Sequence, residues 1–191
     1  MLKRKTILPI CGFILLAALL YGLSMEKNRY QRTFVSYQTP DLTLLNQHGQ
    51  PVPLRSYLQS DKPLMLEFIF TSCTTLCPNQ SVKFANFQKR LAPDTQQVQL
   101  LSITVDPETD TPAVLLHYLQ QYGAQPGWDF LTGSREDIKQ VMTAFGIKPS
   151  DMITLDSSLL LRSAKSGKWL KIDGQLQSED FVREYQQLID L

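Results

Sequence analysis

A short apolar run, followed closely by two cysteines, limits what this chain can fold into. The run from Leu64 to Phe70 predicts a buried strand, and Pro78 suits the first turn of a helix. Cys73 and Cys77 lie between them, so both sulfurs are expected at a strand-to-helix turn. The N–H groups and the dipole at a helix N-terminus favour a thiolate there. Thiolates serve both disulfide exchange and soft-metal binding, so the pattern indicates redox or copper chemistry.

The first thirty residues are expected to lie outside the folded domain. Residues 1–6 form a basic tail, and residues 7–23 form an uncharged apolar span at the short end of what crosses a bilayer. We expect an uncleaved, single-pass signal-anchor in the cell inner membrane, with the tail in the cytoplasm and the domain on the periplasmic side. A cleaved signal peptide is the alternative, although no A-x-A-like site follows the span. Residues 24–40 are expected to form a polar tether.

Charge and cysteine content narrow the classes of function. The chain has 191 residues, 43% of them apolar, and a formal net charge of +1, which suits one domain behind a tail. The excess of basic residues lies near the N-terminus, so no basic run predicts a nucleic-acid partner. Cys11 lies inside the apolar span and leaves Cys73 and Cys77 as one pair in the domain. Two cysteines alone do not fill a zinc shell. A plain stabilising disulfide is an alternative, but so small a loop constrains the unfolded chain only slightly.

Strands and helices are predicted to alternate along residues 41–191. Ser134 and Ser178 are expected to cap the last two helices. This order predicts an α/β sandwich with a mixed sheet. The strands are expected within 41–54 around a turn at 47–50, and at 63–70, 98–105, 128–132, 155–164 and 168–173; the helices are expected at 78–91, 113–122, 135–145 and 179–191.

Several motifs, in order, resemble those of the SCO/SenC family. They are FTSCTTLCP at 70–78, SITVDPETDTP at 102–112, and GWDFLTG at 127–133 with FGI after it. The resemblance implies a thioredoxin-like sandwich over 41–191, with a central mixed sheet flanked by helices and preceded by one N-terminal transmembrane helix. It also implies a part in the assembly of cytochrome c oxidase.

The resemblance implies a metal site as well. Family members bind copper through two cysteines, here Cys73 and Cys77, and a distant histidine; Asp106 would lie in a loop near them. Counting back from Gly167 places the histidine position at Asp156, so the expected imidazole is missing. Two thiolates hold Cu(I) without a third ligand, whereas Cu(II) depends more on nitrogen, so Cu(I) is the expected ion. Asp156 beside the cysteines would either oppose a thiolate or act as a base.

Other side chains are weaker candidates for the third ligand. His48 falls in the predicted turn, where a solvated surface histidine is the ordinary interpretation. His117 lies within a predicted helix, where a partly buried, hydrogen-bonded histidine is expected. Met142 and Met152 carry soft sulfur, but Met142 lies on the apolar face of its helix and is expected to pack.

Two functions remain open on these residues. The first is copper delivery to, or copper-site cysteine reduction in, cytochrome c oxidase, whose subunit would be the partner. The second is a thiol–disulfide oxidoreductase that uses no copper, in which Cys73 attacks a partner disulfide and Cys77 resolves it. Another copper or thiol protein at the membrane is the alternative partner. Whether the chain is an enzyme stays open; if it is one, it is expected to be a thiol–disulfide oxidoreductase. A site that has drifted to a structural role is a third hypothesis, which the intact motifs oppose.

Overall fold

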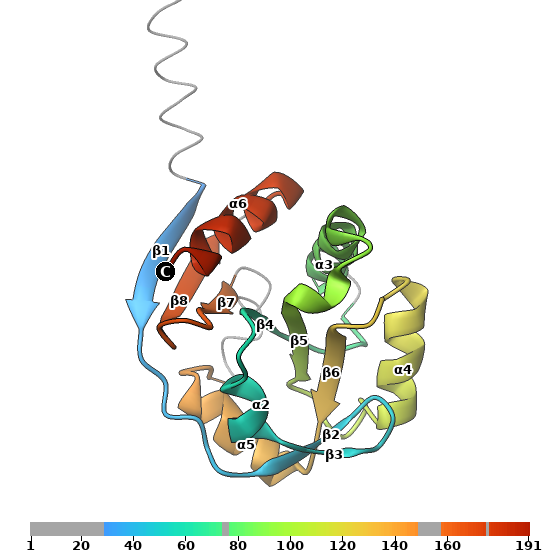
Figure 1. Ribbon diagram of the computed structural model, residues 1–191. Helices are drawn as coiled ribbons and strands as arrows, with labels where there is room; N and C mark the ends of the chain where they lie inside the picture. The colour runs from blue at the N-terminus through green and yellow to red at the C-terminus, as the bar shows by residue number, and fades with distance from the viewer. Residues whose placement is uncertain (1–28, 74–76, 149–157, 175) are drawn as a thin grey trace, which may run out of the picture.

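The computed structural model describes residues 29–73, 77–148, 158–174 and 176–191, arranged around one eight-stranded sheet (Figure 1). β4, β5 and β6 run parallel to one another, and every other neighbouring pair is antiparallel. The mixed sheet predicted from the sequence is therefore confirmed. In sheet order the strands are β1 (Tyr30–Val35), β8 (Trp169–Gly174), β7 (Ser158–Arg162), β4 (Leu64–Ile69), β5 (Gln99–Thr104), β6 (Trp128–Thr132), β2 (Thr43–Asn46) and β3 (Pro51–Pro53).

Helices cover both faces of the sheet and make it a sandwich. On one face, α3 (Cys77–Leu91), α4 (Pro112–Gln121) and α6 (Ser178–Ile189) share a buried cluster with the strands. On the other, α2 (Leu54–Leu58) and α5 (Arg135–Ala144) share a second cluster. A short 3₁₀ helix, Thr95–Gln97, precedes β5. The thioredoxin-like arrangement expected from the sequence is confirmed.

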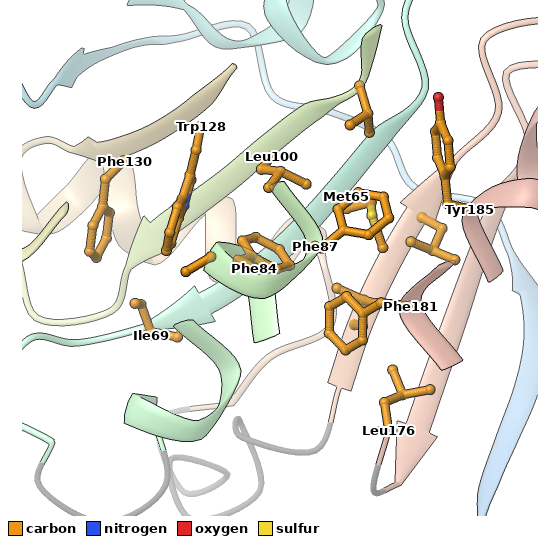
Figure 2. Close-up of a cluster of buried hydrophobic side chains, with 14 of the residues drawn as sticks. Met65, Ile69, Phe84, Phe87, Leu100, Trp128, Phe130, Leu176, Phe181 and Tyr185 are labelled. Atoms are coloured by element: carbon orange, nitrogen blue, oxygen red, sulfur yellow. The ribbon is translucent and has the colours of Figure 1, made fainter. Parts of the chain in front are cut away.

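Aromatic rings fill the first cluster (Figure 2). The ring of Phe84 on α3 meets Trp128 edge-on, with centroids 5.5 Å apart, and meets Phe181 of α6 at 5.9 Å. Edge-to-face pairs of this kind add to the free energy of burial. They hold α3, whose first residue is Cys77, against the middle of the sheet.

The apolar runs became the central strands because they are covered on both sides. Every residue of β4 is buried, and so is β5 apart from its first residue. Strands buried on both faces read as continuous apolar runs rather than as alternating ones. The register sets Glu67 of β4 beside Ser102 of β5, which places one polar pair in this interior.

Helix ends agree with the predicted caps, with one correction. Ser134 lies before α5, and its Oγ accepts a hydrogen bond from the Asp137 N–H at 3.1 Å, as predicted. Ser178 was predicted to cap the last helix but is its first residue; the N-cap is Gln177. The Asp180 carboxylate accepts from the Gln177 N–H at 2.7 Å, and this contact sets the earlier start.

The sheet begins earlier than the expected domain boundary at residue 41. Residues 30–35, inside the range assigned to a tether, form β1 and pair antiparallel with β8. Most of β1 is exposed, which explains why its sequence reads as polar. No helix within the described residues is long and apolar enough to cross a membrane. The predicted span 7–23 lies outside the described residues.

Candidate functional site

The cysteines lie at the carboxyl end of β4, where the chain leaves the sheet for α3. Cys73 is half-buried, packs against the first cluster, and its N–H donates to the Phe70 carbonyl at 3.3 Å. Cys77 is the first residue of α3, as the strand-to-helix prediction requires. Sites in open α/β sheets form outside the carboxyl ends of parallel strands, and β4, β5 and β6 all end on this side.

A buried carboxylate ties the cysteine-bearing turn to the next strand. Asp110 has no exposed surface, and it accepts a hydrogen bond from the backbone N–H of Thr71 at 3.1 Å. The hydroxyls of Thr71 and Thr104 also donate to this carboxylate. Thr71 precedes Cys73 by two residues, and Thr104 ends β5. Asp110 therefore fixes where the turn carrying Cys73 starts.

The loop that supplies Asp110 is itself pinned at both ends. The N–H of Asp110 donates to the Asp106 carbonyl at 3.0 Å, and the Asp106 N–H donates to Thr104 Oγ1 at 2.9 Å. Glu108, at the exposed tip, pairs with Arg135 at the start of α5. The hydrogen bond and the charge of Arg135 hold the pKa of the Glu108 carboxyl below its ordinary value. The loop therefore connects the site to α5.

Glu67 forms a second buried polar group, on β4 before the turn. Its carboxylate, on a residue 1% exposed, accepts a hydrogen bond from Ser102 Oγ at 2.6 Å, and Trp128 Nε1 donates to the same hydroxyl at 3.0 Å. On the same side of the sheet, the hydroxyls of Ser81 and Tyr118 lie 2.9 Å apart. Ser81 follows Cys77 by one turn of α3, so polar groups continue beneath the start of this helix.

The expected metal ligands are only partly placed. Asp156, predicted to stand at the family's histidine position, and Met152 lie outside the described residues, and of Cys77 only the backbone is described. Among the side chains that the structure describes, no three histidine, cysteine or acidic groups come together as a metal site. Cys73 and Cys77 as ligands, with Asp156 as the third position, remain predictions.

The weaker candidates lie away from the cysteines. His48 is exposed in the turn between β2 and β3, as predicted. Because β2 runs antiparallel to β6, that turn lies at the opposite end of the sheet from Cys73. His117 was expected to be partly buried, which is wrong: it is exposed on α4 and shares a hydrogen bond with Gln121 at 3.0 Å. Met142 is 8% exposed and packs in the second cluster, which confirms the packing interpretation.

Sequence reasoning missed Glu67 and Asp110. Asp106 does lie in the predicted loop, half-buried, but the carboxylate that contacts the cysteine-bearing turn is that of Asp110. For Asp110 the sequence carried one signal of a structural role: the residue stands directly before Thr111 and Pro112, which mark the start of a helix. For Glu67 the only signal was an acid inside an apolar run.

Comparison with known proteins places these features in a family context. The profile of SCO1/SenC matches residues 31–163. An SCO1 protein homolog of Bacillus subtilis is 34% identical over 108 residues, which are 56% of this chain and 55% of that protein. The chain therefore spans about half the length of that relative.

Solved structures share the fold. BsSco, described as a Sco-family cytochrome c oxidase assembly protein with a disulfide switch, is 28% identical with a TM-score of 0.65. That match covers 83% of this chain and 97% of the solved one. Yeast Sco1 with copper bound has a TM-score of 0.64 at 21% identity, over 80% of this chain and 95% of that one. At that identity the likeness concerns the fold alone.

Proposed function

The chain belongs to the SCO1/SenC family, and from this premise we propose that it serves the assembly of cytochrome c oxidase. It would deliver copper to an oxidase subunit or reduce the cysteines of a copper site there. The observation that carries the proposal is the position of Cys73 and Cys77 at the carboxyl end of β4, on a turn that Asp110 holds in place. Its proposed location is the inner membrane, anchored by residues 7–23 with the domain in the periplasm.

Copper would be the cargo of this protein, and the cysteine pair suits the reduced ion. Cu(I) prefers thiolate, and two thiolates suffice to hold it. Each cysteine must lose its proton to bind, so loading releases protons and weakens as the pH falls. The start of α3 favours the thiolate of Cys77, because the positive end of the helix dipole lies there. A carboxylate at position 156 is a hard ligand and adds little to Cu(I) binding.

The turn geometry supports transfer as well as binding. Cys73 is half-buried rather than buried, which is compatible with the approach of a partner thiolate. Asp110 acts as a positioning residue, since it fixes the backbone at Thr71 without touching the sulfur in any described contact. A turn whose start is held in place, with a thiol that is only half-buried, suits an ion that must be bound and then given up.

The second candidate is thiol–disulfide exchange without copper. The aspartate at position 156 favours it, since the family's imidazole is absent there, and BsSco carries a described disulfide switch. The Cys73 thiolate would attack a partner disulfide, form a mixed disulfide and expel one partner thiolate. Cys77 would then attack Cys73 and expel the second partner thiolate. The partner gains two electrons, and the pair ends as a Cys73–Cys77 disulfide.

A Cu(I) competition titration separates the two. It uses the reduced full-length chain in non-ionic detergent, under anaerobic conditions. Truncation at residue 31 is avoided because it removes Arg29 and Tyr30, which bond α6. Copper delivery predicts that the wild-type chain binds one Cu(I) ion. Cys73→Ser and Cys77→Ser are each expected to abolish this binding, and Asp156→His is expected to tighten it. Cys11→Ser is the matched control and leaves the affinity unchanged.

The opposite result supports thiol chemistry. If the wild-type chain does not compete for Cu(I) but gains binding with Asp156→His, copper delivery is refuted. Reduction of a model disulfide that needs Cys73 would then establish the exchange reaction. Failure of both assays would refute both functions.

A further inference from the structure

A cavity of about 690 Å³ lies at the end of the sheet opposite the cysteines. It is bounded by the last residue of β1 and the four residues after it (35–39), by α2, and by the turn between β7 and β8. Arg162, in its wall, pairs with Leu64 at the start of β4, whereas Cys73 follows the end of that strand. Six residues of strand separate the two sites by roughly 20 Å. The cavity is therefore not part of the cysteine site.

The wall of this cavity is basic. Arg55, Arg162 and Lys168 line it, and its lining contains no aspartate or glutamate. Arg55 is balanced in part by Asp41, which is highly exposed and lies 3.6 Å away. Lys168 is exposed in the β7–β8 turn and makes no ion pair within the described part of the chain. Among the residues that the structure describes, the positive charge of this cavity is therefore only partly neutralised.

Of these three basic residues, Arg162 gives the strongest evidence that the cavity is a binding site. It is only 9% exposed, and its Nη1 donates to the Ser60 carbonyl at 3.1 Å. No carboxylate among the described residues lies within ion-pair distance of it. Burial accordingly lowers the pKa of its guanidinium. Buried charges in proteins are ordinarily paired, because removing an ion from water is costly.

The remaining wall is partly apolar. Val35 and Tyr37 line the cavity and are half-buried, and Leu58 and Trp169 in the same lining are buried. The ring of Tyr37 meets Trp169 edge-on with centroids 5.6 Å apart, so this side is firmly packed. The volume lies within the range of small-molecule sites, which combine apolar walls with a few polar groups that fix orientation.

From these observations we propose that the cavity binds a small organic anion. Its phosphate or carboxylate group would pair with Arg162 and Lys168, and its apolar body would lie against Val35 and Tyr37. A guanidinium presents a planar fork of donors that matches both anionic groups. A bound anion would give Arg162 the charged partner that none of the described residues supplies.

Isothermal titration of the full-length chain in non-ionic detergent tests this with three probes. Phenyl phosphate carries both features, inorganic phosphate only the charge, and phenol only the ring. Phenyl phosphate is expected to bind at least threefold more tightly than inorganic phosphate, and phenol at least tenfold more weakly than phenyl phosphate. Binding of inorganic phosphate alone would overturn the organic part of the proposal.

Two lysines of one turn provide a matched pair of variants. Lys168→Gln is expected to weaken phenyl phosphate about fivefold. Lys165→Gln removes the same charge from an exposed position outside the lining and is expected to change affinity less than twofold. Equal effects of the two would mean general attraction to a basic surface and would overturn the site.

Arg162→Gln tests the buried charge directly. We expect at least a tenfold loss of phenyl phosphate affinity, with circular dichroism confirming that the variant is folded. If it does not fold, the comparison of Lys168→Gln with Lys165→Gln decides alone. Cys73→Ser is expected to bind phenyl phosphate as the wild type does, so failure of this proposal is distinct from failure of the copper function.

Discussion

Asp110 has lost all contact with water, yet it stands in a loop of polar residues. Its carboxylate accepts from the Thr71 N–H and from the hydroxyls of Thr71 and Thr104, which replace the water lost on burial. A buried acceptor of this kind is costly to remove, because its donors are then left without a partner. The residue thus links the end of β5 to the turn that carries Cys73.

Asp110→Asn is expected to lower the free energy of unfolding by about 1–3 kcal/mol, because an amide offers only one acceptor oxygen to these donors. The same variant should change the rate at which Cys73 is alkylated, since the start of its turn is released. Urea unfolding and timed reaction with iodoacetamide measure the two effects. Asp94→Asn is the control, because Asp94 is exposed and makes no side-chain cap bond. Equal stability of the two variants would contradict the role given to Asp110.

The position of the cysteine pair was predictable from the sequence, but the two buried acids on β4 and in the loop after β5 were not. Cys73 and Cys77 were placed correctly because strand and helix signals on either side are local. Glu67 and Asp110 are held by groups on other elements, Ser102 and Thr71, which lie 35 and 39 residues away along the chain. Periodicity carries no information about such partners, so the burial of an acid was not predictable.

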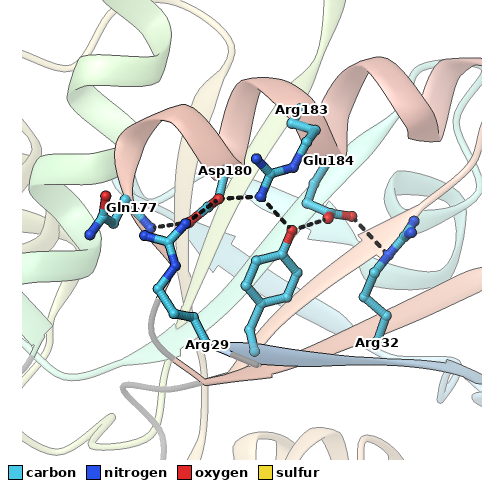
Figure 3. Close-up of polar contacts among 7 residues, drawn as sticks. Arg29, Arg32, Gln177, Asp180, Arg183 and Glu184 are labelled. Atoms are coloured by element: carbon cyan, nitrogen blue, oxygen red, sulfur yellow. Dashed lines mark hydrogen bonds and ion pairs between the residues drawn. The ribbon is translucent and has the colours of Figure 1, made fainter. Parts of the chain in front are cut away.

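The strand β1 shows the same limit for a whole element. Three consecutive polar residues, Gln31, Arg32 and Thr33, lie at its middle, and most of the strand is exposed, so the segment resembled a tether. Its place is set by pairing with β8 and by side chains that reach α6 (Figure 3). Arg29 pairs with Asp180 at 3.3 Å and Arg32 with Glu184 at 3.1 Å, and both acids are 1% exposed.

Tyr30 is the neutral member of this contact between β1 and α6. Its hydroxyl donates to Glu184 Oε1 at 2.6 Å and accepts from Arg183 at 2.9 Å. Tyr30→Phe is expected to cost about 2 kcal/mol, because a buried carboxylate loses a donor. Hydrogen exchange should then quicken in β1 more than in β4, where the sheet is covered on both faces.

Gln31→Ala is the matched control, since Gln31 is the next residue of β1 and is exposed. We expect it to leave both stability and exchange near the wild-type values. A uniform change in exchange across β1 and β4 in Tyr30→Phe would mean that β1 does not open separately from the rest of the sheet.

The whole molecule is a single sheet with a core on each face. Trp128 belongs to the cluster under α3, α4 and α6, and Trp169 to the cluster under α2 and α5. Both clusters use neighbouring residues of the same strands: Met65 faces one and Leu66 the other. Neither core persists if the shared strands separate, so the two are expected to unfold together.

Single-tryptophan variants test this expectation. Trp128→Phe leaves emission from Trp169, and Trp169→Phe leaves emission from Trp128. In each variant the urea midpoint by fluorescence should coincide with that by far-UV circular dichroism, as one cooperative transition requires. Separate midpoints within one variant would show that the two faces melt independently. The midpoints of the two variants need not agree, because each removes different contacts.

The prolines of β3 give the sheet a protected border. The Leu54 N–H and the Gln50 carbonyl form hydrogen bonds with the β2 side of the hairpin. Backbone groups of a strand point alternately to its two sides, so those of Pro51 and Pro53 face away from β2. Proline has no N–H, so these outward positions offer no donor to an incoming strand. A second chain that tried to extend the sheet there would find only carbonyl groups. This edge therefore discourages self-association through strand addition.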